Sequence, residues 1–190
     1  MIKVSRPPEP ERFNIHCRLR GQSWLEKHPH QRRLPDYWSE FRHELADGFK
    51  QRCGYSAMWI PEGQVDHFRS TSKNRGLAYE WDNFRYSAGW INQSKQTVDD
   101  AVIDPFEVKD DWFEIILPSL QLVVTKKVPA SLREKAEYTI VRLRLRDDER
   151  VIRQRRSWFE AWERGDITLE ELRRRAPLIA AAVQRQQRRR

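Results

Sequence analysis

Three groups of polar residues interrupt an aromatic and apolar stretch between positions 53 and 95. The first group is the adjacent pair Asp66 and His67, the second is Asn83, and the third is Asn92 with Lys95 three positions later. An acid, an imidazole, two carboxamides and an amine are side chains from which a hydrolytic site can be built. Together they could activate a water molecule and stabilise negative charge.

This combination favours metal-dependent hydrolysis of a phosphodiester bond. Asp66 and the carbonyl of Asn92 offer hard oxygen ligands to one divalent cation, Mg²⁺ or Mn²⁺. His67, neutral near pH 7, can take a proton from the attacking water. Lys95 can direct a fixed positive charge toward the same phosphate. Asn83 has two N–H donors and a carbonyl acceptor, which suit the holding of a loop.

The elements that must position these side chains read as two strands and a helix. Residues 65–68 and 81–86 are predicted strands, and residues 89–95 are predicted to open a helix. Asn92 and Lys95 are three positions apart, so they share one face of that helix. A hairpin with the helix laid across it would bring carboxylate, imidazole and carboxamide to one point.

The adjacency of Asp66 and His67 sets a geometric condition on this site. Neighbouring side chains on a flat strand point to opposite faces. Both residues can serve one site only if the strand ends or twists there, and the following residues 68–70 give room for that.

The loop between the predicted strands is basic, with Arg69, Lys73 and Arg75 among polar residues. We expect these side chains, with Arg85 on the second strand, to contact the phosphates that flank the cleaved bond. An ordinary solvated loop is an equally good interpretation. No base-reading element is apparent, so the predicted preference for DNA sequence is weak.

The order Asp66-His67, Asn83, Asn92 and Lys95, with nine positions from one asparagine to the next, resembles the HNH endonuclease motif with its ββα-metal core. The resemblance implies Asp66 and Asn92 as metal ligands, His67 as general base and Asn83 as the residue that fixes the loop. A looser similarity to small stand-alone HNH proteins of bacterial defence and mobile elements extends over most of the chain. It implies an endonuclease that nicks one DNA strand per site.

The chain departs from the family pattern where many members bind a structural zinc through two Cys-x-x-Cys pairs. The first pair would be Cys53 and Ser56, and the second would fall near Ser87 and Trp90. A single Cys cannot make a tetrahedral zinc site. We therefore predict no structural zinc, and aromatic packing in its place by Tyr55, Trp59, Phe84, Tyr86 and Trp90.

Composition agrees with a polyanionic partner. The chain has 36 Lys and Arg against 28 Asp and Glu, a net charge of +8. Solvated Arg–Glu pairs explain most of this charge, and the surplus favours DNA. The two Cys do not suggest disulfides. No apolar run is long enough to span a bilayer, so we expect a cytoplasmic protein. A partner ATPase or other defence-system subunit, and a homodimer, are left open.

The expected fold class is α+β, one compact domain with a ββα core. An N-terminal arm and helix occupy 1–52, the core with its following strands 53–128, and a helical region with a basic tail 129–190. The alternative to an endonuclease is a nucleic-acid-binding or regulatory subunit with a dormant HNH fold. Expected local structure is an extended arm over 1–22, a helix over 35–50, strands at 112–117 and 120–125, helical stripes over 132–143, 151–165 and from 168, and a mobile tail over 185–190.

Overall fold

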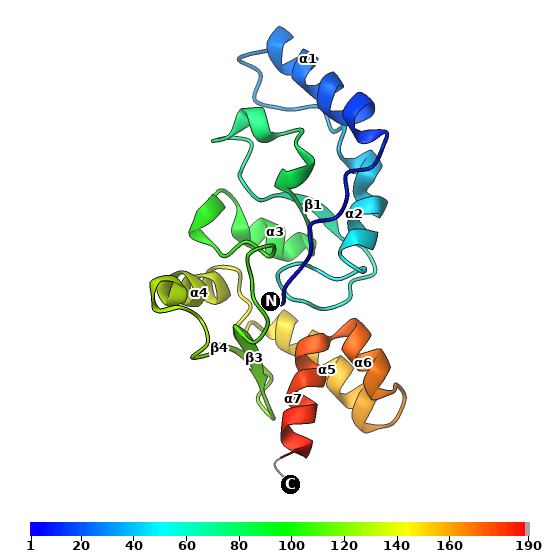
Figure 1. The fold of residues 1–190 in the computed structure, drawn as a ribbon, viewed down its shortest axis with the longest axis vertical. Coiled ribbons are helices and arrows are strands. Elements are labelled where there is room, and N and C mark those ends of the chain that lie inside the picture. The colour runs from blue at the N-terminus through cyan, green and yellow to red at the C-terminus, as the bar shows by residue number, and fades with distance from the viewer. Residues whose placement is uncertain (189–190) are drawn as a thin grey trace.

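The computed structural model describes residues 1–188 and has a mixed α+β architecture. The described residues form seven α-helices and two separate two-stranded antiparallel sheets. The molecule is elongated, with α1 at one end and α7 at the other, and the N-terminus lies near the middle (Figure 1). The helices are α1 (Arg20–Lys27), α2 (Arg42–Gly48), α3 (Gly89–Lys95), α4 (Ala130–Arg142), α5 (Glu149–Glu163), α6 (Leu169–Arg175) and α7 (Pro177–Gln187).

The N-terminal segment is extended only over its first part. A π-helical turn at Asn14–Leu19 runs directly into α1, so the prediction of an extended arm to residue 22 is wrong for its second half. Phe13 is fully buried, and its ring meets the ring of Phe41 at 5.1 Å between centroids. Ile15, two positions later, lies on the outer side of the turn and is 68% exposed.

The helix expected over 35–50 is shorter than its apolar stripe suggested. A 3-10 turn at Ser39–Phe41 precedes α2, which ends at Gly48. Asp36 accepts hydrogen bonds from the backbone and hydroxyl of Ser39, so the chain before that turn is held by a side chain rather than by helical bonds.

The central unit is a hairpin followed by a helix, as predicted, but the second strand is shorter than the predicted 81–86, because Trp81–Asn83 form a 3-10 turn. Strands β1 (Gln64–His67) and β2 (Phe84–Ser87) pair antiparallel, with Asp66 opposite Arg85 and His67 opposite Phe84. Helix α3 begins two residues after β2 and contacts β1. Both strands are short, and β2 is buried throughout, including its polar residues Arg85 and Ser87.

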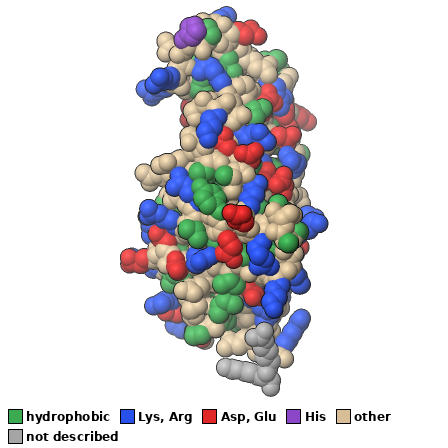
Figure 2. All heavy atoms as spheres, turned by 90° about the vertical axis from the view of Figure 1, so that its left-hand side faces the viewer, with side chains coloured by type: hydrophobic (Ala, Val, Ile, Leu, Met, Phe, Trp, Pro, Cys, Tyr) green, Lys and Arg blue, Asp and Glu red, His purple; other side chains and the backbone are tan. Residues whose placement is uncertain are grey.

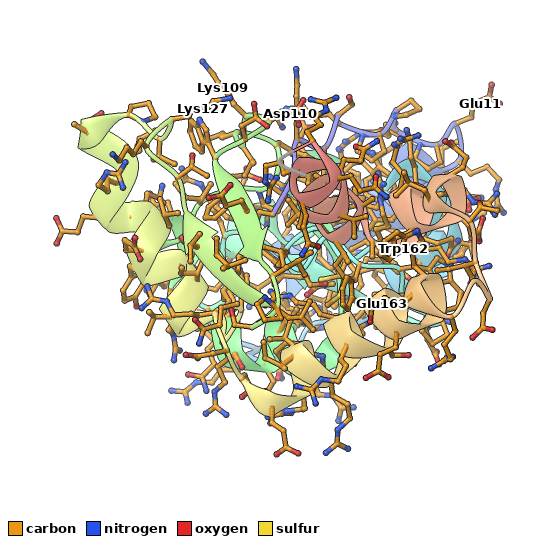
Figure 3. All side chains as sticks on the ribbon, turned by 90° about the horizontal axis from the view of Figure 1, so that it is seen from below. Glu11, Lys109, Asp110, Lys127, Trp162 and Glu163 are labelled. Carbon is orange, nitrogen blue, oxygen red and sulfur yellow. The ribbon has the colours of Figure 1, made fainter. Side chains whose placement is uncertain are left out.

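The second hairpin, β3 (Phe113–Ile116) with β4 (Gln121–Val124), confirms the predicted pair of strands. It lies between two helices, with α7 packed on β3 and α4 packed on β4. Seen from below, the hairpin lies between α4 and α7, while Lys109, Asp110 and Lys127 project to solvent at one edge (Figure 3).

The C-terminal helices follow the sequence signals at their ends. Gly165 has φ +79° just after α5, as a C-cap glycine should. Thr168 Oγ1 accepts a hydrogen bond from the backbone of Glu171 at 3.1 Å and so caps α6. Arg185 lies in α7 and donates to the carbonyl of Ile115 at 3.1 Å, so the tail expected from 185 is docked there; residues 189–190 lie outside the described range.

One buried cation joins the C-terminal region to the rest. Arg155 of α5 is 1% exposed and donates to the carbonyls of Leu120 at 2.8 Å and Leu145 at 2.6 Å. Burial lowers the pKa of Arg155 to about 10. Within residues 1–188, no helix has the length and apolar character that crossing a membrane requires.

Candidate functional site

The β1–β2 hairpin places Asp66 and His67 on opposite faces. The carboxylate of Asp66 turns toward Tyr55 and Lys95, whereas the imidazole of His67 turns toward Trp38. This is the alternation expected of consecutive residues on a strand. The end of β1 at His67 does not bring the two side chains onto one face.

His67 has the environment of a neutral base. Its Nε2 lies 2.8 Å from the carbonyl oxygen of Ala78. A carbonyl only accepts, so Nε2 donates and the neutral ring keeps an unprotonated Nδ1. The ring packs edge-on against Trp38 and Phe84, with centroids 4.6 Å and 5.1 Å away. Burial lowers the pKa of His67 below its ordinary value, so the neutral form dominates at pH 7.

Asn83 holds the loop that follows His67. Its Oδ1 accepts from the backbone N–H of Arg69 at 2.8 Å, and its Nδ2 donates to the carbonyls of Arg69 and Leu77, each at 3.0 Å. All three bonds tie the loop to Asn83, the residue immediately before β2. Asn83 is buried, so these bonds satisfy a side chain that would otherwise be costly there. This geometry fits the loop-fixing role expected for Asn83.

A second brace on this loop was missed by sequence reasoning. Asp99 accepts from the backbone of Ser70 at 2.8 Å and from Nδ2 of Asn74 at 3.0 Å. Asp99 reaches 29 positions back to the loop, a partner that no local motif indicates.

The basic residues of the loop are engaged within the protein. Lys73 Nζ donates to the carbonyl of Thr97 at 2.6 Å. Arg75 donates to the carbonyls of His28 and Gln31, which ties the loop to the segment after α1. Arg69 is half exposed and lies 3.9 Å from Asp100. Of the three, Arg69 is thus the residue least occupied by protein partners.

Asp66 lies in a closed, buried network. It is 2% exposed; its Oδ2 accepts from the hydroxyl of Tyr55 at 2.6 Å and its Oδ1 from Nζ of Lys95 at 3.1 Å. Lys95 is 0% exposed and also donates to the carbonyl of His67 at 2.8 Å. Burial and the neighbouring Asp66 raise the pKa of Tyr55 well above its usual range, so Tyr55 stays a donor. Lys95 therefore neutralises Asp66, and this position is incompatible with the predicted contact of Lys95 with a phosphate.

Asn92 lies on α3 away from this network. Its Nδ2 contacts Oε1 of Gln64 at 3.4 Å, at the opposite end of β1 from His67. A divalent cation does not fit between Asp66 and Asn92 in this arrangement, because both carboxylate oxygens are bonded and an ammonium already occupies the space beside one of them. Within residues 1–188, no cluster of three or more His, Cys, Asp or Glu side chains could hold a metal either.

Arg85 is almost completely buried and paired inside the protein. It is 2% exposed and makes a bidentate pair with Asp104, at 2.8 Å and 2.6 Å. Its guanidinium also stacks 3.7 Å from the ring centre of Phe106. This geometry contradicts the predicted DNA contact of Arg85, because its charge is paired with Asp104 inside the protein.

Two of the four positions that the HNH resemblance assigns to zinc ligands, Cys53 and Ser87, lie side by side in the structure. Cys53 Sγ is 3.9 Å from Oγ of Ser87 and accepts from the backbone of Ala88 at 3.4 Å. Ser56 is also buried. Of the five aromatic residues expected to fill this region, Tyr55, Phe84 and Tyr86 are buried, while Trp59 and Trp90 face the C-terminal helices through Trp158 and Arg150.

One face of the molecule shows no large area of a single charge sign. On the face shown in Figure 2, Lys and Arg side chains are intermingled with Asp and Glu. A cavity of about 420 Å³ beside Asn83 has the same mixed character. It is lined by Arg6, Arg69, Arg85 and Lys135, and by Glu80, Asp82, Asp100, Asp104 and Glu107. On this face and in this cavity, basic side chains are thus balanced by acidic ones.

In comparisons with known proteins, the chain matches no family model and no curated protein.

Proposed function

We propose that the chain is a metal-dependent endonuclease of the HNH type, which hydrolyses DNA phosphodiester bonds one strand at a time. The observation that carries the proposal is His67, a partly buried neutral imidazole whose Nε2 is fixed by the Ala78 carbonyl and whose Nδ1 is left to accept a proton. A base held in this way can deprotonate an attacking water. The strand–strand–helix order and the Asn83 loop contacts support the same assignment.

The proposal places one requirement on the structure. Mg²⁺ or Mn²⁺ would supply charge stabilisation at the phosphate, but the Asp66 carboxylate is bonded to Lys95 and Tyr55. The active endonuclease must therefore have a second arrangement in which Lys95 leaves Asp66. Without that change, the divalent cation has no site at this position.

The same network favours a second candidate, a nucleic-acid-binding or regulatory protein with a dormant HNH fold. A buried Asp–Lys pair that replaces a metal site is what a chain that had lost catalysis would retain for stability. The two candidates differ in one observable, the EDTA-sensitive cleavage of DNA.

The test is a plasmid-nicking assay with Mg²⁺ or Mn²⁺, with and without EDTA, on the full chain. We expect wild-type protein to nick and His67→Ala to lose a factor of about 10²–10⁴ in single-turnover rate, because it lacks the base. His43→Ala, an exposed imidazole on α2, is the matched control and should be unchanged.

Two outcomes contradict the endonuclease. One is the absence of EDTA-sensitive nicking by wild-type protein, which favours the dormant fold. The other is near-normal cleavage by His67→Ala, which removes His67 from the mechanism. Added imidazole separates a chemical from a structural loss, because only a missing base can be replaced by a free one.

A further inference from the structure

A small cavity beside α3 is lined by three arginines. Its volume is about 290 Å³, and Arg142, Arg144 and Arg150 converge on it from the end of α4, the following loop and α5. The remaining lining residues come from α3 and its end: Trp90, Gln93, Ser94 and Gln96. No acidic residue lines it, in contrast to the mixed cavity beside Asn83.

The positive charge of this cavity is only partly compensated. Arg144 and Arg150 both approach Asp148, at 3.8 Å and 3.6 Å, so they share a single carboxylate. Arg142 has no carboxylate within 4 Å among the described residues and makes only long contacts, 3.5 Å to the carbonyl of Lys95 and 3.3 Å to Gln96. Three guanidinium groups beside one carboxylate leave a surplus of two positive charges.

Arg142 also has a hydrogen-bond donor with no acceptor. Its Nε is buried and unpaired, and within residues 1–188 it is the only buried side-chain nitrogen or oxygen without a partner. Buried polar groups in proteins are almost always satisfied, so this nitrogen needs water or a bound ligand as its acceptor. Beside three guanidinium groups, an anion is the ligand that fits.

The backbone at Arg144 supports a functional use of this side chain. Arg144 has φ +54°, the left-handed conformation in which helices usually place glycine. It follows α4 in a Schellman-type turn, since Leu145 N donates to Ile140 O at 2.8 Å and Arg144 N to Val141 O at 3.0 Å. An arginine adopts this conformation less readily than glycine, but it places a charged side chain at the cavity.

We propose that this arginine cavity binds a backbone phosphate of a nucleic acid. Guanidinium groups present paired N–H donors that match phosphate oxygens, and the half-buried Trp90, with Arg150 5.5 Å from its ring centre, forms a wall on which a flanking base can stack. The inference deepens the proposed function, on which the choice of nucleic acid over a free phosphate rests.

The arginine cavity adjoins a second hollow beside Asn92. A neighbouring surface hollow is lined by Gln64, Gly89 and Asn92, and it shares Gln93 and Gln96 with the arginine cavity. A strand whose phosphate lies among the arginines can therefore run over α3 and past Asn92. This path would assign the surplus positive charge of the chain to a specific site. The loop residues Lys73 and Arg75 do not provide such a site.

The experiment measures DNA affinity by fluorescence anisotropy with a labelled duplex of about 20 base pairs in EDTA, so that cleavage plays no part. Arg142→Gln and Arg150→Gln should each weaken binding about tenfold, the effect of removing roughly 1.4 kcal/mol of charge-assisted hydrogen bonding. The slope of log affinity against log salt should fall by about 0.9 for each phosphate that the protein no longer neutralises. Arg153→Gln, with the same charge change on the same helix but an exposed side chain paired to Glu149, should change affinity less than twofold.

The outcomes are separable from those of nicking. Equal affinities for Arg150→Gln and Arg153→Gln overturn the proposal, even if wild-type protein nicks DNA. Weaker binding by the cavity variants supports it, even if no nicking is found. Arg150 is exposed, so its variant tests the idea if Arg142→Gln fails to fold. The last measurement is calorimetry with inorganic phosphate. If the wild-type protein binds phosphate at micromolar concentration, and the variants lose this binding but keep their DNA affinity, the cavity is a site for small anions. That result would overturn the assignment to DNA.

Discussion

Replacing Lys95 with methionine tests the central buried network directly. The substitution keeps the length of an unbranched side chain and removes the ammonium that bonds Asp66 at 3.1 Å and the carbonyl of His67 at 2.8 Å. Asp66 would keep only the Tyr55 hydroxyl as a partner. The expected result is a large loss of stability, because a carboxylate is left buried and uncompensated.

The size of the loss follows from the geometry. Two unit charges 3.1 Å apart attract by about 5 kcal/mol at an effective dielectric constant near 20. Removal of one partner from a buried pair typically costs about 3–5 kcal/mol. In a domain of this size, about 1 kcal/mol shifts the melting temperature by about 2–4 °C. Lys95→Met should therefore lower the melting temperature by about 6–20 °C.

The assay is thermal or urea unfolding followed by circular dichroism. Lys127→Met is the matched control: Lys127 pairs with Asp111 at 2.6 Å, but both side chains are about two-thirds exposed. That pair should contribute less than about 1 kcal/mol. The double variant Asp66→Asn with Lys95→Met removes both charges, so it should be more stable than Lys95→Met alone.

Two results would refute this reasoning. If Lys95→Met is no more destabilising than Lys127→Met, the buried ion pair does not exist in solution. If the double variant loses as much as the two single variants added together, Asp66 and Lys95 do not interact.

Further expectations concern titration and buried arginines. Because burial lowers the pKa of His67, single-turnover cleavage should rise with pH and reach its plateau with a midpoint below 6.5, and a midpoint above that value would contradict the neutral base. For the same reason, His67 should destabilise the fold as the pH falls through 6.5, because the unfolded chain then binds a proton that the folded chain refuses. Arg85→Met should cost about 3–5 kcal/mol of stability by leaving Asp104 unpaired, while DNA affinity per folded molecule stays within twofold. Arg155→Met, which removes donors to three backbone carbonyls, should destabilise the fold without changing the salt dependence of DNA binding.

Local patterns were sufficient for the order of the elements around the site. Residues 65–68 and 81–86 have strand composition, and the polar segment between them is typical of a loop. The hairpin and the helix after it could therefore be predicted. The loop-fixing use of Asn83 followed from its donor and acceptor inventory, and the structure gives it three bonds to that loop. Strand composition and the donors and acceptors of one side chain can be read from the sequence without knowing the bonding partners.

The partners of the buried charges could not be predicted in this way. Asp66 is bonded by Tyr55, eleven positions before it, and by Lys95, twenty-nine after it. Arg85 pairs with Asp104 across nineteen positions. A charged residue in sequence is normally solvated, so composition alone assigns such side chains to surface or substrate. Only the packing of separate elements shows that they neutralise one another.

Lys95 joins the two proposals physically, and yet they can be tested apart. Its ammonium belongs to the Asp66 network, while its backbone carbonyl contacts Arg142 of the arginine cavity at 3.5 Å. Lys95→Met removes the ammonium and keeps the carbonyl, so it should change stability and leave DNA affinity near the wild-type value. Arg142→Gln does the opposite, because Asp66 and Lys95 keep each other as partners. If Lys95→Met weakened DNA binding as much as Arg142→Gln, the two sites would form one unit, and the separate phosphate site inferred for the arginines would be wrong.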